Sequence, residues 1–151
     1  VRTQIQLTSS QCARLKKLAS QRKKSAAEIS GGEGHAAVAE EFRTLLLDES
    51  PLTTTGPVVV ETDALLRRRI GVEAVRDFHT RILPVISVMW LDAEVYEKAL
   101  LPYLASGRTG PSLVDFSSFA LMRTRGVTHA LTLDRYFAEQ GFDCLPNFRA
   151  E

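Results

Sequence analysis

The first thirty positions of the chain predict a strand followed by a helix. Apolar and polar residues alternate from Val1 to Leu7, which is the pattern of a half-buried β-strand. From residue 8 to about residue 23 the apolar positions recur at helical spacing instead. A second helix opens at Ser25, but it meets Ser30-Gly31-Gly32 within about a turn, and glycine breaks helices. This glycine-rich stretch is the clearest junction in the sequence.

Beyond the junction, strand patterns alternate with helix patterns. Helices are predicted over residues 35–47, 57–69, 71–83, 92–104, 112–125 and 134–140, and strands over residues 52–55, 85–91, 129–133 and 142–145. Such alternation favours a parallel sheet with helices on both faces. The longest apolar run, Ile82–Leu91, is well short of the roughly 18 residues that cross a bilayer, so it predicts a buried strand rather than a membrane segment.

Composition and charge refine this picture. The 151 residues are 44% hydrophobic and 25% charged, the balance of a small globular protein. No basic-then-apolar signal segment opens the chain, so we expect a cytoplasmic protein without a membrane partner. Residues 1–30 carry seven Lys or Arg against one acid, a net charge of +6, whereas the remainder carries twelve against seventeen, a net charge of −5. The asymmetry predicts two parts, 1–30 and 31–151, with the first suited to a polyanion.

Three acidic residues occupy positions where carboxylates from separate elements can converge. Asp134 directly follows a predicted strand, Asp115 begins a helix, and Glu61 lies on the helix after strand 52–55. The carboxyl ends of parallel strands, and the helices that follow them, meet at one edge of a sheet. Carboxylate oxygens are the ligands that a hard divalent cation prefers. Each acid also has a simpler interpretation, as a helix N-cap, a first-turn acid facing the helix dipole and a solvated residue, respectively.

Three stretches match a known family in order and separation. They are TTTGPVVVET with LLRRR (residues 53–62 and 65–69), SLVDFSSFALM (112–122) and ALTLDRYF (130–137). Through them, residues 35–146 resemble the PIN-domain ribonucleases of the VapC toxin type. The resemblance implies a parallel sheet flanked by helices, and acids that bind Mg²⁺ or Mn²⁺, which activates water to hydrolyse RNA. It assigns the catalytic and metal-binding roles to Glu61, Asp115 and Asp134.

The same resemblance predicts partners and contacts. We expect an RNA substrate, a cognate VapB-like antitoxin and a homodimer. The candidate contacts with the RNA backbone are Arg67, Arg68, Arg123 and Arg135. A run of charge is more often a solvated face, and this alternative stays open for each arginine. Trp90 and Met89, which lie within the predicted strand 85–91, are expected in the core.

The N-terminal part departs from the family pattern. The family's domain opens with a hydrophobic strand that ends in an aspartate and lies in the middle of the sheet, and no such strand precedes His35. Residues 1–29 instead resemble the ribbon-helix-helix start of a VapB-type antitoxin, in which two chains pair their strands into a ribbon that enters the DNA major groove. Arg2, Gln4 and Gln6 would be its DNA-binding face, because Arg suits guanine and Gln suits adenine.

These features together predict a PIN-like α/β fold that lacks the family's first strand and carries a short strand-helix appendage. Val1–Leu7 is amphipathic, whereas a central parallel strand is usually apolar on both faces, so we do not expect it to fill the gap. A register in which residues 58–66 supply the missing strand and Glu61 the first ligand stays open.

Three functions follow from these expectations. The first is a toxin-antitoxin-related, divalent-metal-dependent endoribonuclease, impaired by loss of the first aspartate. The second is a DNA-binding, antitoxin-like regulator. The third is an inactive toxin remnant that acts by binding a partner.

Overall fold

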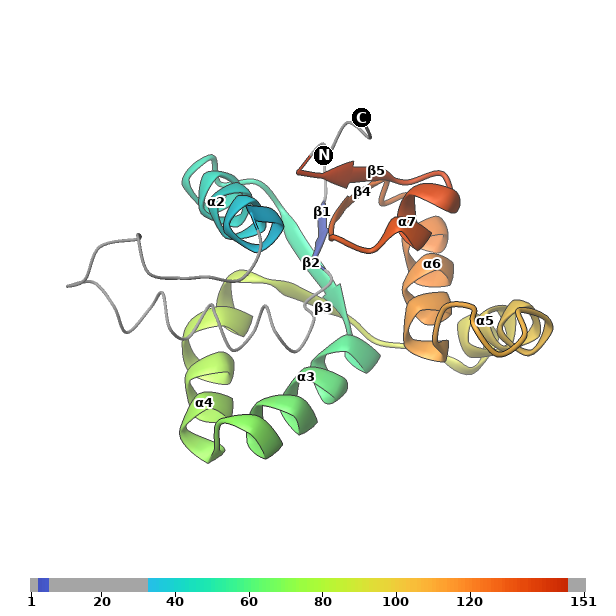
Figure 1. Cartoon of the computed structure of the whole chain (residues 1–151), viewed down its shortest axis with the longest axis horizontal. Helices are drawn as coiled ribbons and strands as arrows, with labels where there is room; N and C mark the ends of the chain where they lie inside the picture. Colours follow the sequence, from blue (N-terminus) through green and yellow to red (C-terminus); the bar gives the residue numbers. More distant parts are fainter. Residues whose placement is uncertain (1–2, 6–32, 147–151) are drawn as a thin grey trace.

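A five-stranded parallel sheet forms the centre of the protein (Figure 1). The computed structural model describes residues 3–5 and 33–146, with side chains described from residue 36. The strands are β1 (Thr3–Ile5), β2 (Leu52–Thr55), β3 (Ser87–Met89), β4 (His129–Leu131) and β5 (Asp143–Leu145). Their order in the sheet is β3-β2-β1-β4-β5, and every neighbouring pair is parallel. The predicted α/β fold with a parallel sheet is therefore confirmed.

The helices begin and end close to the predicted bounds. They are α2 (Glu33–Leu47), α3 (Gly56–Arg69), α4 (Val72–Asp77), α5 (Ala93–Ala105), α6 (Leu113–Arg125) and α7 (Arg135–Glu139). Polar N-caps fix several starts, as for Asp92, whose Oδ1 accepts a hydrogen bond from the Val95 N–H at 2.9 Å. Gly126, with φ of 67°, ends α6 in the left-handed conformation that glycine adopts without strain. Over the described ranges, no helix is long and apolar enough to cross a membrane.

Helices cover both faces of the sheet, as the alternation predicts. On one face, α2, α3 and α4 pack against β2 through a cluster that includes Val38, Leu66 and Leu131. On the other face, α5, α6 and α7 pack around Phe119, Phe137 and their neighbours, with the two phenyl rings edge to face and their centroids 4.8 Å apart. The successive residues Ala130 and Leu131 of β4 belong to opposite clusters, as side chains of a strand buried on both faces should.

The segment predicted as one helix over residues 71–83 is divided in the structure. The helix α4 passes into a π-helical turn, η2 (Phe78–Ile82), and then a 3₁₀ turn, η3 (Leu83–Val85), which contains Pro84. Proline has no N–H to donate and disfavours an α conformation in the residue before it, so the regular helix ends ahead of it.

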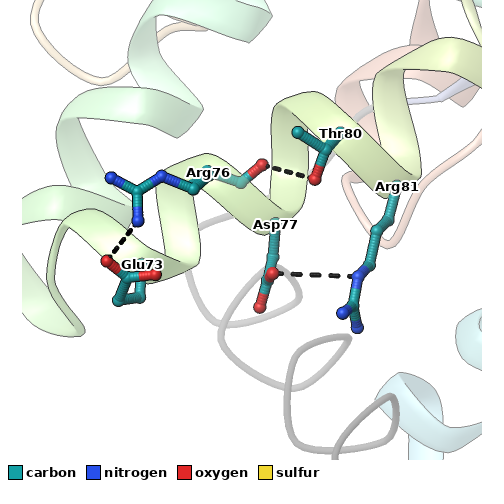
Figure 2. Close-up of polar contacts among 5 residues, drawn as sticks. All are labelled: Glu73, Arg76, Asp77, Thr80 and Arg81. Carbon is teal, nitrogen blue, oxygen red and sulfur yellow. Dashed lines mark hydrogen bonds and ion pairs between the residues drawn. The ribbon is translucent and has the colours of Figure 1, made fainter.

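Figure 2 shows that two arginines of this segment are engaged locally. Arg76 Nη1 lies 2.5 Å from Glu73 Oε1, and Arg81 Nε lies 3.8 Å from Asp77 Oδ1. Thr80 Oγ1 also donates to the Arg76 carbonyl oxygen at 2.9 Å. These pairs are exposed and contribute little to stability. Each of the two arginines nevertheless has an acid of the same segment beside it.

The middle of the sheet is occupied, which differs from our expectation that the central strand is lacking. Gln4 of β1 is paired with Thr53 of β2 on one side and with Ala130 of β4 on the other. Without β1, the facing edges of β2 and β4 would be left unpaired, and satisfying them outweighs the amphipathic pattern from which we inferred that Val1–Leu7 could not fill this position. The alternative in which residues 58–66 form the first strand is wrong, because Gly56–Arg69 is helical.

Candidate active site

Three elements bring Glu61, Asp115 and Asp134 to the carboxyl end of the sheet. The helix α3 begins directly where β2 ends (Figure 1). Glu61 lies in the second turn of this helix. Asp134 follows β4 and is the N-cap residue of α7. Asp115 is in the first turn of α6, a helix that packs against both α3 and β2. Strands β2 and β4 flank the central strand, so their carboxyl ends open on the same edge.

Electrostatic coupling joins these carboxyl groups. Burial raises the pKa of Glu61 above its ordinary value, and the neighbouring Asp115 carboxylate raises it further. Burial also raises the pKa of Asp134; the hydrogen bond from the Tyr136 N–H opposes this rise, and the Asp115 charge adds to it. Asp115 is therefore close enough to act on both other carboxylates, and negative charge accumulates at this edge of the sheet.

Both aspartates also cap helices, as their simpler interpretations predicted. Asp115 Oδ2 accepts hydrogen bonds from Ser112 N at 2.8 Å and from Ser112 Oγ at 2.7 Å, and Ser112 Oγ accepts from Asp115 N at 3.2 Å. This reciprocal pair is a capping box. Asp134 Oδ1 accepts from Tyr136 N at 2.9 Å, and Asp134 N donates to Thr132 Oγ1 at 3.0 Å. These hydrogen bonds hold each aspartate at the start of its helix, whether or not its carboxylate also binds a metal.

The side chains are not gathered around a single point as they stand. Among the residues that the structure describes, no three His, Cys, Asp or Glu side chains form a group that could hold a metal ion. The donor chemistry nevertheless suits a hard cation, because all three groups are carboxylates, and Glu61 and Asp134 are partly desolvated in the field of the Asp115 charge. The assignment of Glu61, Asp115 and Asp134 as metal ligands stays a prediction.

The neighbouring acid Asp63 is separate from this group. Its two carboxylate oxygens lie 3.0 and 2.9 Å from His79 Nε2. Asp63 thus lies beside His79, whereas the Asp115 charge acts on Glu61.

The predicted RNA-binding arginines are exposed and lie in two places. Arg67 and Arg68 are in the last turn of α3. Arg123, near the end of α6, donates to Gln140 Oε1 at 2.7 Å and covers the Phe142 ring, while Arg135 Nε lies 3.6 Å from Glu139 Oε1. The pairs of Arg123 and Arg135 are local, which leaves the end of α3 as the stronger candidate for a phosphate contact.

The predicted DNA-binding face lies mostly outside the described residues, which include Gln4 but not Arg2 or Gln6. The backbone at Gln4 is already paired on both sides within the sheet. A ribbon between two chains needs a strand with one unpaired edge, so this fold does not offer Thr3–Ile5 for such a ribbon.

The expectation that Trp90 belongs to the core is wrong, whereas Met89 is buried as expected. Trp90 follows β3 and is 63% exposed. Its position one residue beyond the strand places it at the carboxyl edge of the sheet, where α3 also begins. The apolar run that suggested burial gave no sign that the strand ends at Met89.

The raised pKa values predict how stability depends on pH. The stabilising contribution of Glu61 and Asp134 is fully present below their unfolded-state pKa values, about 4, and is lost as pH rises through their higher folded-state values. In divalent-free buffer, Glu61→Gln should therefore raise the thermal midpoint at neutral pH, and this gain should vanish as the pH falls toward 4. Glu97→Gln, on the exposed face of α5, is the matched control. A rise in the thermal midpoint that persists unchanged at acidic pH would contradict the link between the raised pKa of Glu61 and stability.

Comparison with known proteins identifies the family. The PIN domain family matches residues 11–143. The 23S rRNA-specific endonuclease VapC20 of Mycobacterium tuberculosis, in two strains, is 34% identical over 90 residues, which cover 59% of this chain and 69% of that protein. The crystal structure of Mycobacterium tuberculosis VapC20, described as a sarcin-ricin loop cleaving toxin, has the same fold, with a TM-score of 0.66 at 24% identity over 93% of this chain and 95% of that one. The chain therefore belongs to the PIN-domain family, among its VapC-type toxin endonucleases.

Proposed function

We propose that this protein is a divalent-metal-dependent endoribonuclease, with Glu61, Asp115 and Asp134 as the ligands of Mg²⁺ or Mn²⁺. The observation that carries the proposal is that one carboxylate, Asp115, raises the pKa of two others that come from separate helices. A divalent cation bound at this carboxyl edge of the sheet would offset the repulsion among the three carboxylates. The RNA-cleaving activity in the names of its VapC20 relatives supports RNA as the substrate class.

The chemistry requires these residue types. A bound divalent cation supplies Lewis acidity, which stabilises negative charge developing on a phosphodiester and makes water a better nucleophile. The carboxylates would hold and orient that cation through α3, α6 and α7. The capping bonds hold Asp115 and Asp134 in the first turn of α6 and at the N-cap of α7, respectively. Arg67 and Arg68 would attract the RNA backbone to the outer end of α3.

The sequence lacks one acid of the family's set. The central strand β1 is followed by Gln6 rather than by an acid. With these three carboxylates rather than the family's full acidic set, we expect weaker metal binding and slower cleavage than in a complete site. The proposal thus includes an impaired enzyme, not an inactive one.

RNA cleavage by the purified chain tests the proposal. Incubation with RNA and Mn²⁺ or Mg²⁺ should give discrete fragments, and EDTA should abolish them; metal binding is measured in parallel by calorimetry. If the protein binds the metal but cuts no RNA over a wide range of metal concentration, the alternative of a toxin remnant that acts by partner binding replaces the nuclease. If it neither binds metal nor cuts RNA, the assignment of the three ligands fails as well.

A further inference from the structure

Trp90 is held at the edge of the candidate active site. It is the only tryptophan in the chain, and 63% of its surface is exposed. Its six-membered ring lies against Gly56, the first residue of α3: a Cβ added to Gly56 would overlap Trp90 Cε3 and lie 2.7 Å from Cζ3. Glycine at this position therefore lets the indole rest directly on the start of α3 while much of the ring stays open to solvent.

The exposed ring forms one wall of a pocket of about 460 Å³. The other walls come from the first three turns of α3, including Pro57, Val60 and Glu61, and from Val114 at the start of α6. Glu61 is the one charged side chain among those that line it. The volume falls within the range of small-ligand sites, about 300–1,000 Å³.

The pocket is continuous with the carboxylate group. Glu61 belongs to both, and Val114 immediately precedes Asp115, which is coupled to Glu61. A group that occupies this pocket therefore contacts Glu61, one of the three carboxylates of the proposed metal site. The lining offers a phosphate no cationic partner and includes the Glu61 carboxylate, so it favours an apolar, flat group over a phosphate.

We propose that this pocket takes a single unstacked nucleobase of the RNA substrate, with Trp90 as the surface on which the base stacks. The inference rests on the proposed nuclease function and adds a specificity-determining residue to it. A nucleobase has the required chemistry: its flat face stacks on an indole, and proteins that bind single strands use such aromatic platforms. Charge complementarity supports the same occupant. Arg67 and Arg68 lie one turn beyond the pocket residue Ala64 on α3, so they would attract the phosphates of the RNA that flank the stacked base.

Binding of short single-stranded RNA, measured without cleavage, tests the inference. Fluorescein-labelled oligonucleotides are titrated with the full chain in EDTA and with the Asp115→Asn variant in Mg²⁺, and affinity is read from anisotropy. One set of oligonucleotides carries a single abasic nucleotide moved along the strand. At one position, loss of the base should weaken binding to the wild-type chain by about 5- to 150-fold and quench Trp90 emission less.

The variants separate stacking from a structural effect. Trp90→Ala should bind the intact oligonucleotide about 5- to 150-fold more weakly and show no further loss with the abasic one, and Trp90→Phe should retain part of the affinity. Tyr96→Ala, which removes an exposed aromatic side chain of α5, is the matched control and should bind as the wild type does. Because Trp90 is largely exposed, its substitution should leave the thermal midpoint nearly unchanged, which confirms that each variant is folded.

Three results would overturn the inference. The first is equal affinity of the wild type and Trp90→Ala for intact RNA, and the second is additive losses from Trp90→Ala and the abasic site. The third is a blue shift of Trp90 emission with rising protein concentration in the absence of RNA, which would assign the pocket to a second copy of the chain. Base-dependent binding without any cleavage would instead refute the nuclease alone, whereas cleavage that ignores Trp90 would refute only the base pocket.

Discussion

Asp115→Asn is expected to lower the rate of metal-dependent RNA cleavage by at least about 100-fold without destabilising the protein. Removal of one of the three proposed anionic ligands would weaken the binding of a divalent cation, and each tenfold loss of rate corresponds to about 1.4 kcal/mol of transition-state stabilisation. The fold should tolerate the change, because the amide oxygen of Asn can accept the same hydrogen bond from Ser112 N. Stability at neutral pH should rise slightly, since repulsion of Glu61 and Asp134 is relieved.

Ser112→Ala is the reciprocal control. It removes the hydroxyl that accepts from Asp115 N and donates to Asp115 Oδ2, but it keeps all three carboxylates. We expect a loss of about 1 kcal/mol in the free energy of unfolding and nearly full cleavage below the unfolding transition. Denaturant titration and initial cleavage rates, measured on both variants, separate the role of Asp115 as a helix cap from its proposed role as a metal ligand. If Asp115 serves only as a cap, Asp115→Asn will cleave RNA as fast as the wild type.

The local rules of the sequence account for most of the elements. The polar caps Asp92, Ser112 and Asp134 begin their helices where the pattern predicts, because unsatisfied N–H groups of a first turn need a side-chain acceptor. Strand Leu52–Thr55 also matches, although three threonines fill it. Their hydroxyl groups are satisfied in the core, as when Thr53 Oγ1 donates to the Ser87 carbonyl oxygen at 3.0 Å.

The features that sequence reasoning missed depend on tertiary position. The exposure of Trp90 follows from where β3 ends and from the absence of a side chain on Gly56, a residue thirty-four positions earlier. The coupling of Asp115 to two other acids requires α3, α6 and α7 to be placed in three dimensions. The resemblance to VapC-type proteins provided that placement in advance, whereas helix periodicity alone left each acid with a simpler interpretation.

The central strand was missed for a different reason. Hydrophobic alternation reports which side chains a strand can bury, but the position of a three-residue strand depends on which backbone edges need partners. Both β2 and β4 present such an edge toward Thr3–Ile5. The backbone pairing therefore determines the location of β1, and its own side-chain pattern carries little weight.

Gln4→Pro is accordingly expected to destabilise the protein by at least about 2–3 kcal/mol, a large share of the roughly 5–15 kcal/mol that holds a domain together. Proline removes a backbone N–H from a strand that is paired on both sides, and it leaves an acceptor of a neighbouring strand unsatisfied. Gln4→Val is the matched control: it keeps the N–H and has a high intrinsic preference for β-strands, so its unfolding free energy should stay within about 1 kcal/mol of the wild type.

The same two variants discriminate between the sheet and the DNA-binding alternatives for the N-terminal part. If residues 1–7 form a base-reading ribbon instead of β1, Gln4→Val should abolish DNA binding, and Gln4→Pro should leave the unfolding of the α/β domain unchanged. If β1 completes the sheet, Gln4→Pro should lower the urea midpoint and reduce RNA cleavage with it, because β2 and β4 carry α3 and Asp134 to the site. The central strand then contributes to activity through the elements it joins, even without an acid of its own.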